Sequence, residues 1–427
     1  MGSNSCNNSK KKKKTKRGGT KKKMTVEQSI AYKSVSEWVF LDGTSVCSNG
    51  STRFDIDDDF KVKLVNMKVE KMVFELHSHS VFSDGFLSPL KLVERAHQHG
   101  VQVLSLTDHD TMAGIPQAVE AAKKYGIKII PGVEISTIFT PRTESGLEEP
   151  VHVLAYYSSC GPSNYEKLDQ FLANIREGRY LRAKNMITKL NKLKLPIKWE
   201  SVERIAGDGV APGRVHVARA MVEAGHVENL KQAFSRYLYD GGPAYSTGSE
   251  PDAEEAVQMI RETGGVGVLA HPWALKNPLA VIRRLKEAGL HGLEVYRSDG
   301  KLAAFSDLAD TYDLLKLGGS DYHARGGTSE SALGSVSLPV VALHEFLKVA
   351  RPIWCSAIKN TVDQYVNDPT ESNLEHILRY TNIKLAKGGV SSVTNNIELV
   401  HQCVSQWLTN EEQKNADFVA VKNITCF

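Results

Sequence analysis

The sequence predicts an α/β protein built on a parallel sheet or barrel. Between residues 72 and 353, short apolar runs typical of strands alternate with segments of helical periodicity. This alternation indicates parallel strands joined by helical crossovers. Histidines and carboxylates follow several of the apolar runs, at the point where each strand should end. A β/α barrel carries its active site at that edge, so the pattern also indicates where the site should lie.

Seven strands are expected in this region, and helices separate most of them. The strand candidates are 72–76, 101–106, 127–130, 151–155, 266–269, 292–295 and 314–317. The helix candidates are 89–99, 113–125, 252–263, 278–288 and 300–312.

Residues 163–250 interrupt this rhythm between the fourth and fifth strands and are predicted to be a helical insertion that covers the barrel mouth. The insertion begins with one long helix at about 166–193, which carries Arg176, Arg179 and Arg182 at a spacing of three. Such a row is usually a solvated helix face. The alternative is phosphate capture, because the guanidinium fork matches phosphate oxygens.

Three further segments flank the main domain, which we place at residues 71–355. Residues 24–70 form an adaptor segment with a candidate helix at 26–39, and residues 356–427 form a helical C-terminal extension. The first 23 residues hold ten Lys and Arg and no acidic residue. They are expected to form a disordered tail that is either simply solvated or contacts nucleic acid or an import receptor.

Composition limits the remaining choices. No apolar run approaches the length of about 18 residues that a membrane helix needs, and no signal-peptide core is present, so no membrane association is expected. The six cysteines are scattered without a CxxC pair, as in a reduced intracellular protein. The predicted location is therefore the nucleus or the cytoplasm.

The stretch Phe74–Asp110, together with Glu134, carries the strongest chemical signal. His77 and His79 stand two apart where the first strand ends, and residues two apart in a strand point to the same side. Asp84 follows on a turn rich in Ser and Gly, and His109 ends the second strand. Imidazoles and carboxylates gathered in this way are predicted to hold metal ions.

A second HxH pair, His97 and His99, serves as a comparison within the same chain. It lies in a helical segment that begins with Ser88 as a candidate N-cap and Pro89 at the first helical position. Residues two apart on a helix diverge by roughly 200°. This pair is therefore not expected to chelate one ion.

The complete ligand inventory contains six histidines and three carboxylates and no thiolate. Its members are His77, His79, Asp84, His109, Glu134, His152, His271, Asp321 and His323. Nine ligands exceed what one ion needs, and mixed imidazole and carboxylate ligands suit Mn²⁺, Fe²⁺ or Zn²⁺. Two to three divalent ions, with Mn²⁺ favoured, are therefore expected. Clustered ions of this kind activate water for attack on a phosphate ester, so the predicted reaction is phosphoester hydrolysis by a metal-bound hydroxide.

The motifs that contain these residues resemble those of the PHP (polymerase and histidinol phosphatase) superfamily. They are FELHSHSVFSDG, SLTDHD, IPGVEIS, VHVLAYY, LAHP and GGSDYH. The resemblance covers about residues 72–355 and implies a distorted seven-stranded β/α barrel with a trinuclear metal site. Within the superfamily, REGRYLRAKNM and APGRVHVARAMVEAG resemble the bacterial nucleoside 3′,5′-bisphosphate phosphatases that also act as 5′→3′ exoribonucleases.

The resemblance also implies how the residues divide their work. One ion would be held by His77, His79, Glu134 and Asp321, a second by Asp84, His109 and His323, and a third by His152 and His271 with Glu134 as a bridge. The residues Arg179, Arg182, Arg214 and His216 match insertion positions that would face substrate phosphate.

The sequence thus predicts a metal-dependent phosphoesterase that hydrolyses nucleotides or the 5′ ends of short single-stranded RNA. One alternative is a small-molecule phosphatase of the histidinol-phosphate type. Another is a noncatalytic RNA-binding scaffold that works through the basic tail.

Overall fold

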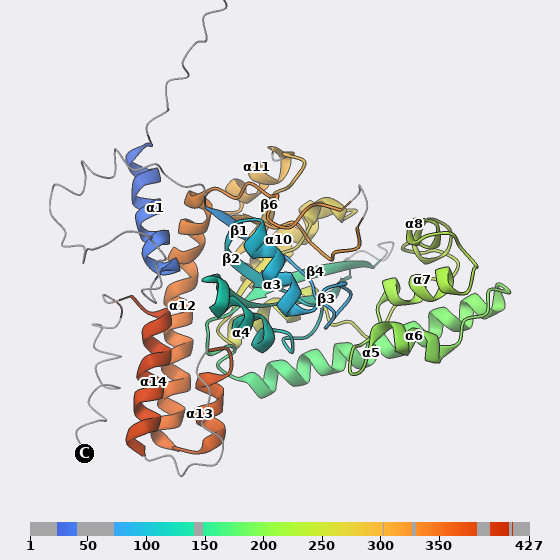
Figure 1. Ribbon diagram of the computed structural model, residues 1–427. Coiled ribbons are helices and arrows are strands. Elements are labelled where there is room, and N and C mark those ends of the chain that lie inside the picture. The colour runs from blue at the N-terminus through green and yellow to red at the C-terminus, as the bar shows by residue number, and fades with distance from the viewer. Residues whose placement is uncertain are drawn as a thin grey trace, which may run out of the picture.

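Seven strands form one sheet whose order follows the sequence from β1 to β7 in the computed structural model (Figure 1). The structure describes residues 24–40, 72–140, 148–301, 303–326, 330–381, 393–409 and 412. The basic tail and the acidic part of the adaptor segment therefore lie outside the described residues. The strands are β1 (Val73–Glu75), β2 (Val101–Leu106), β3 (Lys128–Phe139), β4 (Glu149–Tyr156), β5 (Val266–Leu269), β6 (Gly292–Tyr296) and β7 (Leu315–Gly318).

The predicted parallel pairing is wrong at β4. This strand runs antiparallel to both β3 and β5, whereas the other neighbouring pairs are parallel. The sequence estimate ended β3 at residue 130, but the strand continues to Phe139 and the chain returns at Glu149. Strands joined by a short return can pair only in opposite directions, because a parallel pair needs a long crossover.

The two edge strands of the sheet approach each other just beyond their ends. An isolated parallel bridge joins Ser78, after β1, to Tyr322, after β7. The His79 backbone N–H also donates to the Tyr322 carbonyl at 2.8 Å. The sheet therefore curls into a distorted barrel, as predicted, with its edges linked at the level of the histidines.

Alternate strand residues pack into two different cores, as the period of two along a strand requires. Outward residues such as Ile129 and Val153 pack under the surrounding helices. Inward residues such as Ile130 and Leu154 fill the barrel interior. The surrounding helices are α3 (Pro89–Gln98), α4 (Ile115–Tyr125), α9 (Ala253–Glu262), α10 (Pro278–Ala288) and α11 (Ala303–Thr311).

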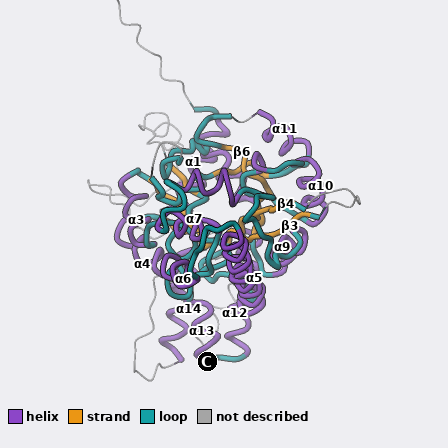
Figure 2. Tube along the Cα trace, turned by 90° about the vertical axis from the view of Figure 1, so that its right-hand side faces the viewer, coloured by secondary structure: helices purple, strands orange, loops and turns teal. Residues whose placement is uncertain are grey.

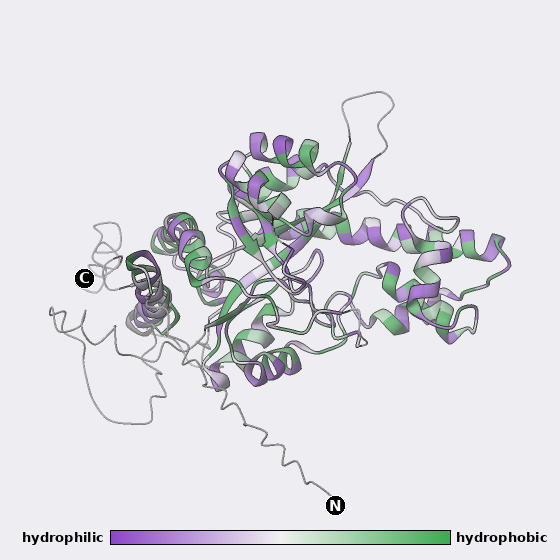
Figure 3. Cartoon of the chain, turned by 90° about the horizontal axis from the view of Figure 1, so that it is seen from above, coloured by the Kyte–Doolittle hydropathy of each residue, from purple (hydrophilic) through white to green (hydrophobic). Residues whose placement is uncertain are grey.

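The insertion has a small hydrophobic core of its own and extends away from the barrel (Figures 1 and 3). Its long helix α5 (Tyr165–Lys192) starts beside the barrel and runs outward to the other insertion helices. These are α6 (Trp199–Ala206), α7 (Arg214–Glu223) and α8 (Leu230–Ala233), followed by a π-helical turn at Phe234–Leu238.

The C-terminal extension continues directly from the barrel. Helix α12 (Val340–Asn367) crosses the position at which the extension was predicted to begin, and α13 (Glu371–Leu378) and α14 (Val393–Trp407) complete it. Helix α1 (Val26–Val39) packs on α12, so the two ends of the described chain meet on one side of the barrel (Figures 1 and 2). No helix in the described part of the chain is long and apolar enough to cross a membrane.

Three tryptophans join these terminal helices to the inward-facing core. Trp354 of α12 is 2% exposed, and its ring lies 6.4 Å from that of Trp38 and 5.5 Å from that of Trp407. Its indole N–H donates to the Tyr156 carbonyl of β4 at 3.1 Å. One side chain therefore connects α1, α14 and the sheet.

We predict that Trp354→Ala lowers the free energy of unfolding by about 3–5 kcal/mol, the usual result of truncating a large buried aromatic side chain. Chemical denaturation followed by circular dichroism measures this change. Leu279→Ala, at a position that is 52% exposed, is the control and should change stability little. A small effect of Trp354→Ala would mean that the terminal helices contribute little to the stability of the barrel.

Candidate metal centre

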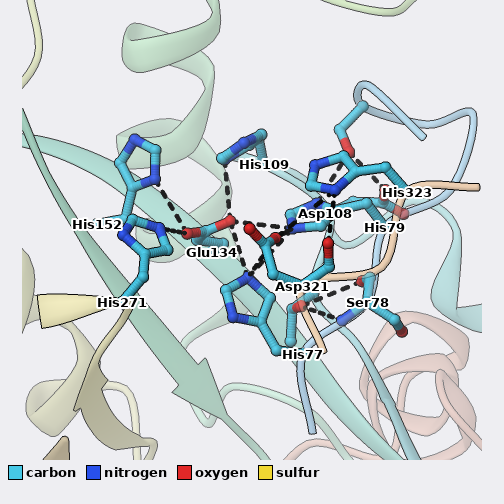
Figure 4. A network of polar contacts seen from close by, with 12 residues as sticks. His77, Ser78, His79, Asp108, His109, Glu134, His152, His271, Asp321 and His323 are labelled. Carbon is cyan, nitrogen blue, oxygen red and sulfur yellow. Dashed lines mark hydrogen bonds and ion pairs between the residues drawn. The ribbon is translucent and has the colours of Figure 1, made fainter. Parts of the chain in front are cut away.

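The nine predicted ligands all lie at one end of the barrel interior, and Figure 4 shows most of them around Glu134. Their strands bring them there by alternation: Glu134 shares the inward face of β3 with Ile130, and His152 shares that of β4 with Leu154. His152 lies near the beginning of β4, not near its end as the sequence estimate had it. Because β4 is antiparallel, its beginning lies at the edge where the parallel strands end.

Glu134 is the hub of the cluster. It is 1% exposed, and both carboxylate oxygens contact imidazole nitrogens. Oε1 contacts His152 Nδ1 and His271 Nε2, each at 3.0 Å. Oε2 contacts His77 Nε2 at 3.2 Å, His79 Nε2 at 3.1 Å and His109 Nδ1 at 3.3 Å. One carboxylate thus lies within reach of five histidines.

The ligand atoms fall into three overlapping groups, and within each group they lie within 4.8 Å of one another. The groups are His77, His79, Glu134 and Asp321; His79, Asp84, His109 and His323; and His109, Glu134 and His152. His271 joins them through Glu134. Glu134 belongs to two of the groups, and its two carboxylate oxygens could serve two neighbouring ions, which a neutral imidazole could not.

The chemistry of these atoms fits divalent metal ions. His77 Nε2 and His79 Nε2 lie 3.2 Å apart and are aimed at the same point, as two ligands of one ion would be. Asp84 Oδ1 and His109 Nδ1 are buried, and their polar contacts are ion pairs with other ligand-type residues, His323 Nε2 at 3.0 Å and Glu134 Oε2 at 3.3 Å, rather than well-formed hydrogen bonds. Imidazole and carboxylate ligands without thiolate suit Mn²⁺, Fe²⁺ and Zn²⁺.

The carboxylates and imidazoles of the cluster strongly shift one another's pKa values. Burial alone would raise the pKa of Glu134, but the imidazoles of His109, His77 and His152 outweigh it and hold that pKa well below its usual range. Burial lowers the pKa of His79, yet Asp321 and Glu134 raise it to about 10. The carboxylates therefore favour positive charge at this point, and a bound cation would take the place of imidazole protons.

Two buried glutamates, neither of them among the predicted ligands, hold the ligands in place. Glu294 of β6 accepts from the His271 backbone N–H at 2.7 Å, and its other oxygen lies 3.1 Å from His77 Nδ1. Glu75 of β1 accepts from the backbone N–H groups of Ser320 and Gly334, each at 2.8 Å. Alternation could have identified Glu294, because Leu293 and Val295 on either side of it face outward.

The two aspartates that flank His109 have different tasks. Asp108 accepts hydrogen bonds from Ser80 and Ser83, which fixes the turn that follows His79. Asp110 accepts from the Ser136 backbone N–H at 2.7 Å and pairs with Arg179 Nε at 2.5 Å.

Three residues of the site adopt a left-handed backbone conformation that residues other than glycine rarely adopt. The φ angles are 56° at Asp110, 28° at His271 and 52° at Asp321. Such conformations persist only where the surrounding structure enforces them, and they cluster at functional sites. Position 319 requires glycine for a steric reason, because a Cβ there would lie 2.4 Å from His77 Cβ.

A cavity of about 330 Å³ opens beside the cluster, between the barrel and the insertion. Asp84 and His109 line its inner end, and Arg176, Arg179 and His216 line its insertion side. The Gly213 backbone N–H donates to His216 Nδ1 at 2.9 Å, which places the proton of the neutral ring on Nε2. Burial lowers the pKa of His216 to about 4, so the ring is neutral near pH 7.

Two of the four predicted phosphate-facing residues line this cavity, and the other two do not. Arg182 pairs with Glu250 at 2.9 Å, and Arg214 pairs with Asp240 at 2.5 Å. Arg325, which the sequence analysis missed, pairs with Asp84 Oδ2 at 2.9 Å beside the cluster. No pattern in the sequence distinguishes Arg325 from other loop arginines.

The second HxH pair lies away from the cluster, as expected. His97 is on α3, where its ring stacks on Tyr125 of α4 with ring centroids 4.7 Å apart. His99 caps the end of the same helix.

Comparisons with known proteins agree with this architecture. A model of the PHP domain matches residues 75–238. The 5′-3′ exoribonuclease of Haemophilus influenzae is 35% identical over 58% of this chain and 89% of its own length. The 3′,5′-nucleoside bisphosphate phosphatase of Chromobacterium violaceum is 32% identical over 66% of this chain and 94% of its own.

A solved structure, assigned as a metal-dependent phosphoesterase from Bifidobacterium adolescentis, is similar with a TM-score of 0.57 and 30% identity. The match covers 65% of this chain and 96% of that one. All of these relatives carry the names of hydrolases. The chain belongs to the PHP family of hydrolases.

Proposed function

We propose that this protein hydrolyses phosphate esters of nucleotides, namely nucleoside 3′,5′-bisphosphates and the 5′ ends of short single-stranded RNA. The observation that carries the proposal is a metal-type cluster that opens directly into a cavity lined by arginines. The names of the bacterial relatives support the same substrates.

The proposed cofactors are two to three divalent ions, with Mn²⁺ as the preferred activator. His77, His79, Glu134 and Asp321 would hold one ion, and Asp84, His109 and His323 a second. His152 and His271 would hold a third together with Glu134. Ions at such positions supply Lewis acidity and lower the pKa of water.

The protein's own part in the reaction is to bind and orient the ester beside the cluster. Arg179 is 8% exposed and is fixed by Asp110 and Ser136, so its charge is held at the cavity wall without freedom to move away. The Nε2–H of His216 is free to donate to a phosphate oxygen, because Nδ1 is occupied by Gly213. A second phosphate on the substrate would find these donors while the first lies at the cluster. Arg182 and Arg214 would stabilise the insertion through their ion pairs with Glu250 and Asp240 and would not contact the substrate.

The proposed activity is tested with purified protein supplied with Mn²⁺ and assayed for phosphate release. We expect turnover of a nucleoside 3′,5′-bisphosphate and of a 5′-phosphorylated oligoribonucleotide, and loss of both on chelation. Elemental analysis should find two to three ions per chain. Preference for a small amino-alcohol phosphate would favour a histidinol-phosphate type of enzyme, and no turnover with full metal loading would refute the phosphoesterase assignment.

Glu134→Gln is expected to lower both metal content and kcat/KM, the latter by at least about a hundred-fold. Removal of an outer partner of a metal ligand commonly costs ten- to a hundred-fold, and Glu134 contacts five histidines itself. His97→Ala is the matched control, since this histidine is exposed on α3. Equal effects of the two substitutions would contradict the assignment of the site.

His216→Asn should lower kcat/KM for the bisphosphate by about ten- to a hundred-fold, the equivalent of one lost hydrogen bond to a charged group. Asparagine keeps an acceptor for the Gly213 N–H but has no donor at the Nε2 position. Activity on p-nitrophenyl phosphate, which has no second phosphate, should fall less. A similar fall on both substrates would place His216 at the phosphate being cleaved.

A further inference from the structure

The cavity extends well beyond the cluster along helix α5. The residues that α5 contributes follow one face of the helix, at spacings of three and four: Tyr165, Leu168, Asp169, Leu172, Arg176 and Arg179. Fourteen residues separate Tyr165 from Arg179, which at 1.5 Å per residue is about 21 Å. This lined face is longer than a single nucleotide.

The outer end of this face is completed by the C-terminal extension. Arg379, just after α13, places its guanidinium 3.6 Å from the centroid of the Tyr165 ring. His376 of α13 pairs with Glu166, the next residue of α5, at 2.9 Å. The extension thus packs against the end of α5 whose Tyr165 lines the outer end of the cavity.

The charge of Arg379 is not neutralised by a carboxylate among the described residues. Its Nε is buried and has no hydrogen-bond partner in the same part of the chain. The acidic residue nearest along this face, Asp169, pairs instead with Arg176 at 3.4 Å. Tyr165 remains partly exposed while lining the cavity. Arg379 is partly exposed as well, so a positive charge and an aromatic ring lie side by side next to the outer end of the cavity.

We infer that Tyr165 and Arg379 form an outer subsite for a nucleotide further along a single-stranded RNA substrate. Arg379 would bind a backbone phosphate, and Tyr165 would offer a base the face of its ring that Arg379 does not cover. Aromatic rings combined with basic side chains are the usual means of binding single strands without reading their sequence. The inference rests on the proposed function and assigns part of its substrate preference to the C-terminal extension.

The test compares a nucleoside 3′,5′-bisphosphate with a 5′-phosphorylated pentaribonucleotide, using the full-length protein supplied with Mn²⁺. Arg379→Gln should reduce the ratio of kcat/KM for the pentaribonucleotide to that for the bisphosphate by about ten-fold, mainly through KM. Tyr165→Leu, which keeps an apolar side chain but removes the ring, should reduce the same ratio.

Salt dependence provides a readout that a purely structural role would not change. Loss of one phosphate contact should make the slope of log kcat/KM against log salt shallower by about 0.7 for the pentaribonucleotide. Arg379→Lys should retain the steeper slope. Arg283→Gln, at an arginine of α10 that is 65% exposed, is the control and should leave the ratio and the slope unchanged.

Equal losses on both substrates, or an unchanged salt slope in Arg379→Gln, would overturn the outer subsite while leaving the proposed function intact. Absence of turnover on both substrates in the unmodified protein would instead overturn the proposed function, and the subsite with it.

Discussion

The structure depends on the burial of one carboxylate among five imidazoles. Glu134 alone would be costly to bury as an anion, and the histidines alone would be costly to bury as cations. Together they are tolerable only while the strands hold them within about 3 Å of one another. This requirement explains the second layer of polar contacts. Glu75 ties down the backbone around His77 and Ser320, and Glu294 fixes His77 and the backbone of His271.

The reversed strand β4 is the feature that lets Glu134 and His152 act together. In an all-parallel barrel a helix would separate consecutive strands in the sequence, and β3 would end near the cluster. Here β3 runs past the cluster and β4 returns beside it, so Ser136 and His152 are directly paired. The price is an irregular barrel, whose edges are linked by the bridge between Ser78 and Tyr322 rather than by a full ladder.

Much of this could be predicted from the sequence, and the failures have physical causes. Strands such as β2 and β5 were located well because apolar runs and turn residues bound them clearly. The ligand-type residues could be recognised because all of them except Asp84 lie in a strand or within five residues of the end of one, and Asp84 lies on the turn that follows His79. The direction of β4 was missed because periodicity reports which face a residue occupies but not which way its strand runs. The pairing of Arg182 with Glu250 and of Arg214 with Asp240 was missed because helical spacing does not identify a partner distant in sequence.

Helix α12 has a structural consequence for the whole chain. It leaves the barrel and enters the C-terminal extension as one helix, although Pro352 lies inside it and removes one of the backbone hydrogen bonds of the helix. Trp354 anchors the helix to β4 near its midpoint, and α1 packs along it. The direction of the extension is thereby set by the sheet itself. A protein or ligand bound to the extension would therefore keep a constant orientation relative to the barrel mouth.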